Sequence, residues 1–181
     1  MKQNLPYSAF SLIELLTVMA IIGILAALTI PAASSILAGR NLTTGANMLF
    51  DQLVSARQAA SAKNARVRCH IISTNDPRNG DPVGFRCMQA EIFEPSGREW
   101  KPLSRAVVLP ITITADPLRS TLLTNQAANA TNSIEFLPGG RTALPNPSGI
   151  YSITLHNGRN TNNFVTIQID PVSGRCRTFQ P

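Results

Sequence analysis

Near its start the chain reads Phe10-Ser-Leu-Ile-Glu-Leu-Leu-Thr-Val-Met-Ala-Ile-Ile-Gly-Ile-Leu-Ala-Ala-Leu-Thr-Ile-Pro31, an apolar run that contains a single acidic residue, Glu14. A helix that spans a membrane needs about 20 mostly apolar residues, so this run predicts a transmembrane helix. An acidic side chain deep in a bilayer costs roughly 3 kcal/mol, and we therefore expect Glu14 to meet a partner. The alternative is an imperfect membrane anchor in which the carboxylate has no role.

The residues around this carboxylate, Ala9-Phe-Ser-Leu-Ile-Glu14, resemble the processing site of type IV prepilins and of type II secretion pseudopilins. The resemblance implies that a prepilin peptidase removes residues 1–9 as a leader peptide. It also implies that Phe10 becomes an N-methylated N-terminus and that Glu14 pairs with the N-terminal amine of a neighbouring subunit during assembly. Ala9 stands where the family usually has Gly, so a small residue is kept before the cut.

An ordinary secretory signal peptide is the competing interpretation of this segment. It fits poorly, because Lys2 alone forms the basic region and no Ala-x-Ala-like site closes the apolar run cleanly. Charge does not fix the orientation, since Lys2 on one side of the run faces Arg40 on the other. The pilin resemblance implies a single-pass protein of the inner membrane whose head lies outside the cytoplasm.

The helical pattern continues beyond the apolar run. Apolar residues recur three or four positions apart on one face, at Leu42, Ala46, Leu49, Leu53, Ala56 and Ala60. The pattern predicts one helix from Phe10 to about Asn64, with residues 10–33 as the transmembrane and assembly segment and 34–64 as its amphipathic continuation. Gly23 and Pro31 interrupt this helix, and Pro31 in particular favours a kink or local melting.

After Lys63 the chain changes to short segments rich in β-branched and aromatic residues, separated by Pro, Gly and Asn. The predicted strands are 66–73, 84–93, 100–103, 107–114, 133–137, 150–156, 164–170 and 175–179. We therefore predict an α+β fold in which a long N-terminal helix packs on a small antiparallel sheet or sandwich, with residues 65–181 as the β-rich head. The length of the head suits one compact domain.

The three cysteines are Cys69, Cys87 and Cys176. Cys69 and Cys87 fall in two segments that we expect to form a hairpin, so they are the predicted disulfide if the head lies outside the cytoplasm. Three buried free thiols are the alternative. The cysteine spacing fits no zinc motif, and no catalytic constellation stands out, so we predict no metal, no cofactor and no enzymatic activity.

The chain is basic, with a net charge of +6 carried largely by 13 Arg against 3 Lys. Near its end stands Gly174-Arg-Cys-Arg177, in which Arg175 and Arg177 would share one face of a strand and offer two guanidinium groups to phosphates. This resembles the Gly-Arg-x-Arg motif of FimT-type minor pilins, and the resemblance implies that Arg175 and Arg177 contact DNA. Arginines on an edge strand also prevent pairing between sheets, so DNA is not the favoured partner.

The whole architecture resembles the minor-pseudopilin group typified by GspH and FimT. Asp51-Gln-Leu-Val-Ser-Ala-Arg-Gln-Ala-Ala60 and Asn163-Phe-Val-Thr-Ile-Gln-Ile-Asp-Pro-Val-Ser-Gly-Arg175 are also similar to Verru_Chthon cassette protein D, a pilin-like group without an assigned activity. The resemblance implies a structural subunit of a type IV pilus or of a type II secretion pseudopilus. Its partners would be prepilin peptidase, other pilin subunits, the inner-membrane assembly platform and membrane lipid. A DNA-binding minor pilin acting in DNA uptake is the alternative, and the sequence leaves the filament system open.

Overall fold

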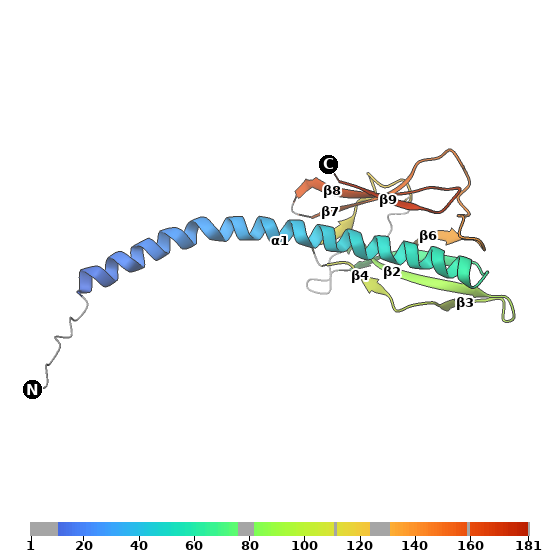
Figure 1. Cartoon of the computed structure of the whole chain (residues 1–181), viewed down its shortest axis with the longest axis horizontal. Coiled ribbons are helices and arrows are strands. Elements are labelled where there is room, and N and C mark those ends of the chain that lie inside the picture. Colours follow the sequence, from blue (N-terminus) through green and yellow to red (C-terminus); the bar gives the residue numbers. More distant parts are fainter. Residues whose placement is uncertain (1–10, 76–81, 111, 124–130, 159, 181) are drawn as a thin grey trace, which may run out of the picture. The chain divides into compact units, whose positions relative to one another are not determined.

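The computed structural model describes residues 11–75, 82–110, 112–123, 131–158 and 160–180, without the side chains at 28–38, 75, 82, 83, 131, 160 and 161. The chain divides into two compact units, Met1–Leu37 and Ala38–Pro181. The second unit contains the C-terminal part of a long helix together with the whole β-sheet. Figure 1 shows the elements in their order along the chain.

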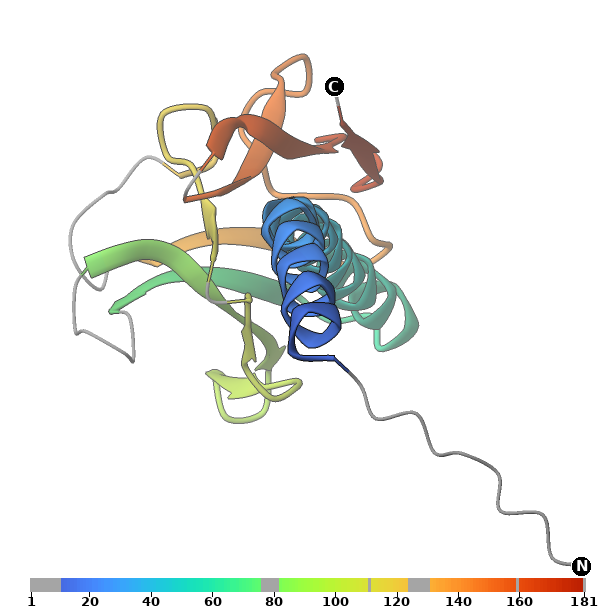
Figure 2. The same ribbon diagram turned by 90° about the vertical axis from the view of Figure 1, so that its left-hand side faces the viewer.

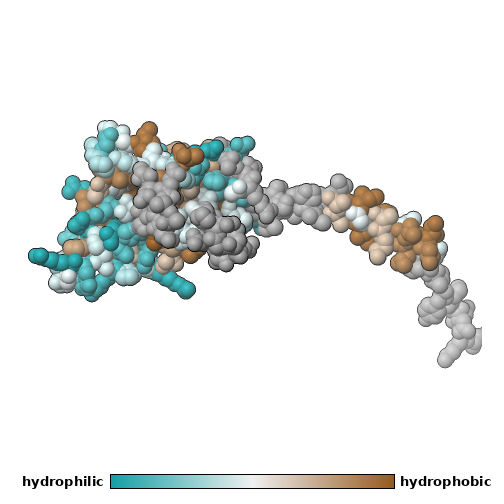
Figure 3. Space-filling view, turned by 180° about the vertical axis from the view of Figure 1, so that it is seen from behind, coloured by the Kyte–Doolittle hydropathy of each residue, from teal (hydrophilic) through white to brown (hydrophobic). Residues whose placement is uncertain are grey.

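The helix α1 runs from Leu12 to Ala62, close to the predicted bounds. The helix continues through Gly23 and Pro31, and the kink predicted there stays a prediction. Large apolar side chains from Leu12 to Leu25 are between 46% and 82% exposed, and Figure 3 shows them gathered over this stretch. They include consecutive residues, so the first turns of α1 are apolar on every side rather than on one stripe.

No helix formed by the described residues is both long and apolar enough to cross a membrane. The predicted transmembrane segment, residues 10–33, lies partly outside the described residues, at Phe10 and at the side chains from position 28 onward.

The second half of α1 is amphipathic, as predicted. Its apolar face is fully buried, with Leu42, Leu49, Leu53, Ala56 and Ala60 at most 1% exposed and Ala46 2% exposed. These side chains join residues of most strands in one hydrophobic core. Gln52, which does not belong to the predicted apolar face, is also buried, and its amide Nε2 donates a hydrogen bond to Ser104 Oγ at 3.0 Å. The helix therefore docks on the head through a continuous apolar stripe with one satisfied amide beside it.

The described strands form one antiparallel sheet in the order β6-β1-β2-β5-β7-β8-β9, with β3 and β4 also paired to β2. Their bounds are β1 Val67–Asn75, β2 Pro82–Glu94, β3 Glu99–Pro102, β4 Val107–Val108, β5 Ile113–Ala115, β6 Thr131–Phe136, β7 Tyr151–Asn157, β8 Asn160–Ile169 and β9 Cys176–Phe179. Figure 2 shows the strands curling around one side of the second half of α1. The predicted α+β class, a helix packed on an antiparallel sheet, is confirmed.

One predicted strand is wrong. Residues 107–114 form two short strands, β4 and β5, instead of one continuous strand. Pro110 stands between them, and its carbonyl accepts a hydrogen bond from Ile113 N at 2.8 Å, which closes a turn. Proline has no backbone N–H to give to a ladder, so a strand through this position would lose a hydrogen bond.

Candidate functional site

The first region of interest is the start of α1. Ala9 and Phe10, the predicted processing site, lie outside the described residues. The Ser11 carbonyl accepts the first helical hydrogen bonds, from Glu14 N at 3.0 Å and Leu15 N at 3.2 Å. Ser11 therefore stands at the N-cap and Glu14 in the first turn, which is the Ser-x-x-Glu pattern of a capping box. An acidic residue in a first helical turn is also favoured by the helix dipole, a role for Glu14 that the sequence interpretation missed.

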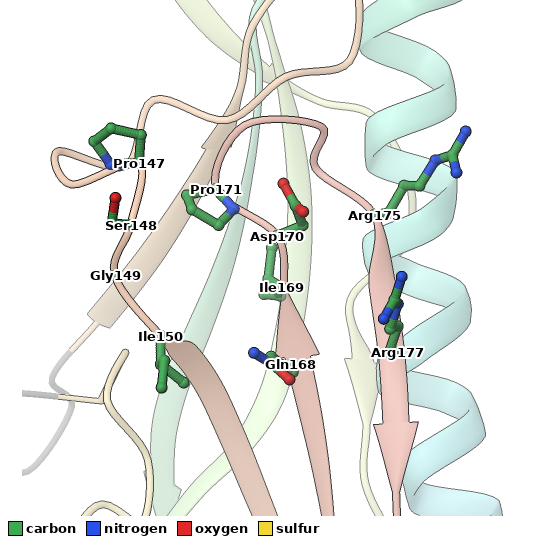
Figure 4. A pocket seen from close by; sticks show the side chains of 10 residues that line it. All are labelled: Pro147, Ser148, Gly149, Ile150, Gln168, Ile169, Asp170, Pro171, Arg175 and Arg177. Atoms are coloured by element: carbon green, nitrogen blue, oxygen red, sulfur yellow. The ribbon is translucent and has the colours of Figure 1, made fainter.

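The second region surrounds Arg175 and Arg177, which the turn between β8 and β9 positions. Asp170 holds that turn, because its Oδ1 accepts hydrogen bonds from Val172 N at 2.9 Å and Ser173 N at 2.7 Å. The backbone hydrogen bond from Ser173, and more weakly the charge of Arg177, lower the pKa of Asp170. Figure 4 shows the Arg175 and Arg177 side chains leaving the β9 segment toward the same side. Both are exposed and line the same two depressions, but β9 begins only at Cys176, so Arg175 precedes the strand and a shared strand face stays a prediction.

The β8–β9 turn is tied to two distant parts of the chain. Arg57 of α1 donates from Nε to the carbonyl oxygens of Ser173 at 2.9 Å and of Gly140 at 3.2 Å. Thr142 Oγ1 donates to the Pro171 carbonyl oxygen. Gly140 and Thr142 follow β6, and β6 and β9 stand at opposite ends of the strand order. The two ends of the curled sheet therefore meet beside α1, with Arg57 bridging them.

This junction forms a depression of about 370 Å³ that is lined by the side chains of Arg57, Arg141, Arg175 and Arg177, by Asp170 and by the turn backbone. A second depression of about 300 Å³ shares Asp170, Arg175 and Arg177 with it. Four guanidinium groups against one carboxylate leave an excess of positive charge. Within the described part of the chain, Arg141, Arg175 and Arg177 make no side-chain hydrogen bond or ion pair.

Arg66, just before β1, and Arg68 of β1 behave differently. Arg66 pairs with Glu135, and Arg68 Nη2 lies 2.8 Å from Glu91 Oε2. The Arg68 guanidinium also stacks on the Trp100 ring, 4.2 Å from the ring centroid. These charges are neutralised within the fold, so the outer face of β1 lacks the excess of positive charge found at the junction.

The cysteines do not form the predicted bridge. The register of β1 and β2 places Cys69 opposite Ala90 and Cys87 opposite Ile72, and all three cysteines are free. Because side chains alternate between the faces of a strand, Cys69 points into the core while Cys87 points to the other face. A Cys69–Cys87 disulfide is therefore incompatible with this register. Burial raises the pKa of Cys69 to about 12 and that of Cys176 to about 11.

Comparison with known proteins found one match to the N-terminal segment and one to the fold. Residues 6–30 match the prokaryotic N-terminal methylation motif, a match that includes Ala9, Phe10 and Glu14. The fold is similar to the crystal structure of the type IV minor pilin FimU from Pseudomonas aeruginosa, with a TM-score of 0.53 and 17% sequence identity over 78% of this chain and 93% of that chain. The chain has a pilin-like fold and carries the N-terminal methylation motif. No curated protein sequence matches this pilin-like chain.

The pilin-like head contains two site residues that the sequence did not predict. Neither Arg57 nor Arg141 belongs to a motif in the sequence. Arg57 contacts the β8–β9 turn, and Arg141 lines the same depression, only because the sheet curls, since Arg57 lies 116 positions before Ser173 in the chain. No local sequence pattern links these residues, so only a contact map of the pilin-like fold could have found them.

Proposed function

We propose that the chain is a structural subunit of a filament of the type IV pilus or type II secretion pseudopilus class. Prepilin peptidase cuts it before Phe10, and the new N-terminus is methylated. Residues 10–33 anchor it in the inner membrane, with the head outside the cytoplasm, until the same segment enters the filament core. The protein works by assembly with other pilin subunits and an inner-membrane platform, without enzymatic turnover.

The observation that carries this proposal is the exposure of apolar side chains all around the start of α1. An exposed apolar surface of this kind needs lipid or other protein to cover it. The first half of an assembly helix is covered by lipid before assembly and by copies of the same helix afterwards. The methylation motif at residues 6–30 supports the cut that would free this segment. The structural neighbour is a minor pilin, and we therefore favour a minor subunit over an abundant one.

The test is the intact mass of the protein extracted from membranes of a host that supplies prepilin peptidase. We expect the mass of a chain that begins at Phe10 and carries one additional methyl group. A chain that keeps residues 1–9 would indicate an anchored protein that prepilin peptidase does not process. Cleavage beyond Pro31 would indicate a secreted β-rich domain, and either result would contradict the filament proposal.

The second candidate function is that of a DNA-binding minor pilin. It is supported by the exposed side chains of Arg175 and Arg177, which make no side-chain hydrogen bond or ion pair within the described residues. DNA binding through phosphates weakens steeply as the salt concentration rises. We expect mature protein in detergent micelles to bind duplex DNA at low ionic strength and to release it as salt is added. Absence of binding at low ionic strength would remove this candidate and leave the filament role intact.

A further inference from the structure

Exposed apolar side chains lie beside the arginines of the β8–β9 region. Ile150, directly before β7, is 69% exposed, and Val172 of the β8–β9 turn is 61% exposed. Ile150 lines the smaller depression together with Pro147 and Pro171, and Val172 lines the larger one. Figure 4 shows Pro147 and Ile150 on one side of the smaller depression and the two arginines on the other. The surface therefore has an apolar part and a basic part next to each other.

This combination is typical of surfaces that bind another protein. Arginine is enriched at protein interfaces, and their strongest contacts combine apolar anchors with charged groups that lose water on binding. Arg57 adds a guanidinium group that is already held, because its Nε donates to the carbonyl oxygens of Gly140 and Ser173. A group that is fixed beforehand loses little conformational entropy when it binds a carboxylate. The surface thus suits a peptide segment that carries both acidic and apolar side chains.

A nucleic acid would use only the basic part of this surface. Single strands stack their bases on aromatic side chains, and the described residues that line the two depressions include no aromatic side chain. Phosphate groups would contact arginines and would gain nothing from Ile150 or Val172. The apolar part therefore favours a protein partner.

A second copy of this chain does not offer the acidic side chains that the surface needs. Carboxylates of the described head already pair with basic side chains at Glu91, Glu94, Glu99, Asp116 and Glu135. The Asp170 carboxylate accepts hydrogen bonds from its own turn. Among the described carboxylates of the head this leaves Asp51, at an exposed position of α1. One carboxylate does not make an acidic surface, so a different chain has to supply the complement.

We propose that Ile150, Val172, Arg175 and Arg177 form a docking surface for an acidic and apolar segment of a different pilin-like subunit. Carboxylates of that segment pair with the guanidinium groups through charge-assisted hydrogen bonds, and its apolar side chains cover Ile150 and Val172. The inference rests on the proposed filament function and names the kind of partner that the head binds.

The first experiment identifies the partner in cells that make the complete set of filament subunits. Ile150 of the full-length chain is replaced by the photo-crosslinking residue p-benzoylphenylalanine, and the crosslinked product is mapped by mass spectrometry. We expect a different pilin-like subunit, captured at a segment in which Asp or Glu stands beside apolar residues. The control has the same residue in place of Val108, which is 58% exposed and lies outside both depressions, and it should not capture that segment.

The second experiment measures affinity with mature full-length protein in detergent micelles. The probes are a synthetic peptide of Glu and Leu residues and a short oligothymidylate. Ile150→Ser combined with Val172→Ser keeps every arginine, and it should weaken peptide binding by at least about tenfold, because two apolar contacts are lost. Val108→Ser removes an equally exposed valine elsewhere and should change peptide affinity by less than about twofold.

The outcomes separate this surface from the filament function on which it rests. Capture of a different subunit from position 150 and not from position 108, with weaker peptide binding in the double variant, supports the proposal. Capture of a second copy, or of no protein, would overturn it even where intact mass shows a chain cut before Phe10. Equal peptide affinities of the double variant and Val108→Ser would overturn it as well. Oligothymidylate binding without peptide binding would assign the arginines to nucleic acid instead.

Discussion

A Cβ atom added to Gly174 would lie 2.3 Å from the carbonyl oxygen of Gly140, closer than non-bonded atoms can approach. Gly174 also has a φ of 66°, in the left-handed region that glycine adopts without strain. The two glycines belong to opposite ends of the strand order, so the contact closes the curled sheet. The glycine of the Gly174-Arg-Cys-Arg177 motif thus has a structural role that is independent of any ligand.

Replacing Gly174 by Ala should destabilise the head. The left-handed backbone costs roughly 1–2 kcal/mol for a residue with a Cβ, and crowding against a backbone oxygen adds about 1–3 kcal/mol. We expect the free energy of unfolding to fall by about 2–5 kcal/mol, measured by urea denaturation followed by circular dichroism. Gly158→Ala is the control, because its nearest neighbour would be 3.9 Å away. Equal stability of the two variants would show that the sheet ends do not meet at Gly174.

Arg57 should stabilise the same junction through its two hydrogen bonds. Arg57→Met keeps most of the apolar stem but leaves the carbonyl oxygens of Gly140 and Ser173 without their charged donor. We expect a loss of about 2–3 kcal/mol in the free energy of unfolding, typical of hydrogen bonds to charged groups. Gln58→Met places the same side chain at the next, exposed position and should change stability by less than about 0.5 kcal/mol. A loss no larger in Arg57→Met than in Gln58→Met would argue against the bridge.

Cys69 should make stability depend on pH in the alkaline range. Burial, with a smaller effect of the neighbouring Cys176, raises the pKa of the Cys69 thiol from 9.0 to about 12. Between these values the unfolded chain has lost the proton and the folded chain has kept it, so stability falls as pH rises, by about 1.4 kcal/mol per pH unit. Under reducing conditions, urea denaturation from about pH 9 to about pH 11 should show a shallower fall for Cys69→Ala than for wild type. Identical slopes would mean that Cys69 ionises normally in the folded head.

Glu14 has two candidate roles, and two substitutions separate them. Glu14→Gln can still serve a capping box but carries no charge, whereas Glu14→Val does neither. If Glu14 pairs with the N-terminal amine of a neighbouring subunit, both variants should insert into the membrane and both should be depleted from sheared filaments. Thr17→Val, a polar-to-apolar change one turn along α1, should assemble normally. Normal assembly of Glu14→Gln would limit the role of Glu14 to helix capping.

The sequence predicted most of the elements, because each depends on neighbours in the chain. The periodicity from Leu42 to Ala60 identified the buried face of α1, since a helix repeats its face every three to four residues. The predicted strands match most of β1–β9, because turn residues separate alternating segments. The prediction of one continuous strand over 107–114 was wrong for a local reason: Pro110 has no backbone N–H for the ladder and therefore indicates a break in a strand.

Some residues of the candidate site could be predicted from the sequence, and others could not. Arg175 and Arg177 could be singled out because they lie two positions apart, and alternation along a strand predicts that they share one face. Arg57 and Arg141 could not, because their place beside Arg175 results from the closure of the sheet. The Cys69–Cys87 pairing failed for a related reason. A hairpin was predictable, but its register was not, and a shift in register exchanges the faces of all side chains.

By itself the sequence determined the apolar start of the helix, its amphipathic continuation, the antiparallel β-rich head and the processing motif, since these follow from local periodicity and short motifs. The tertiary structure alone decided which residues from distant segments meet: Gly174 with Gly140, and Arg57 with the turn that carries Arg175. The physical reason is that contacts between the two ends of a sheet depend on the curvature and register of every strand between them. No local pattern of residues encodes the combined curvature and register of all these strands.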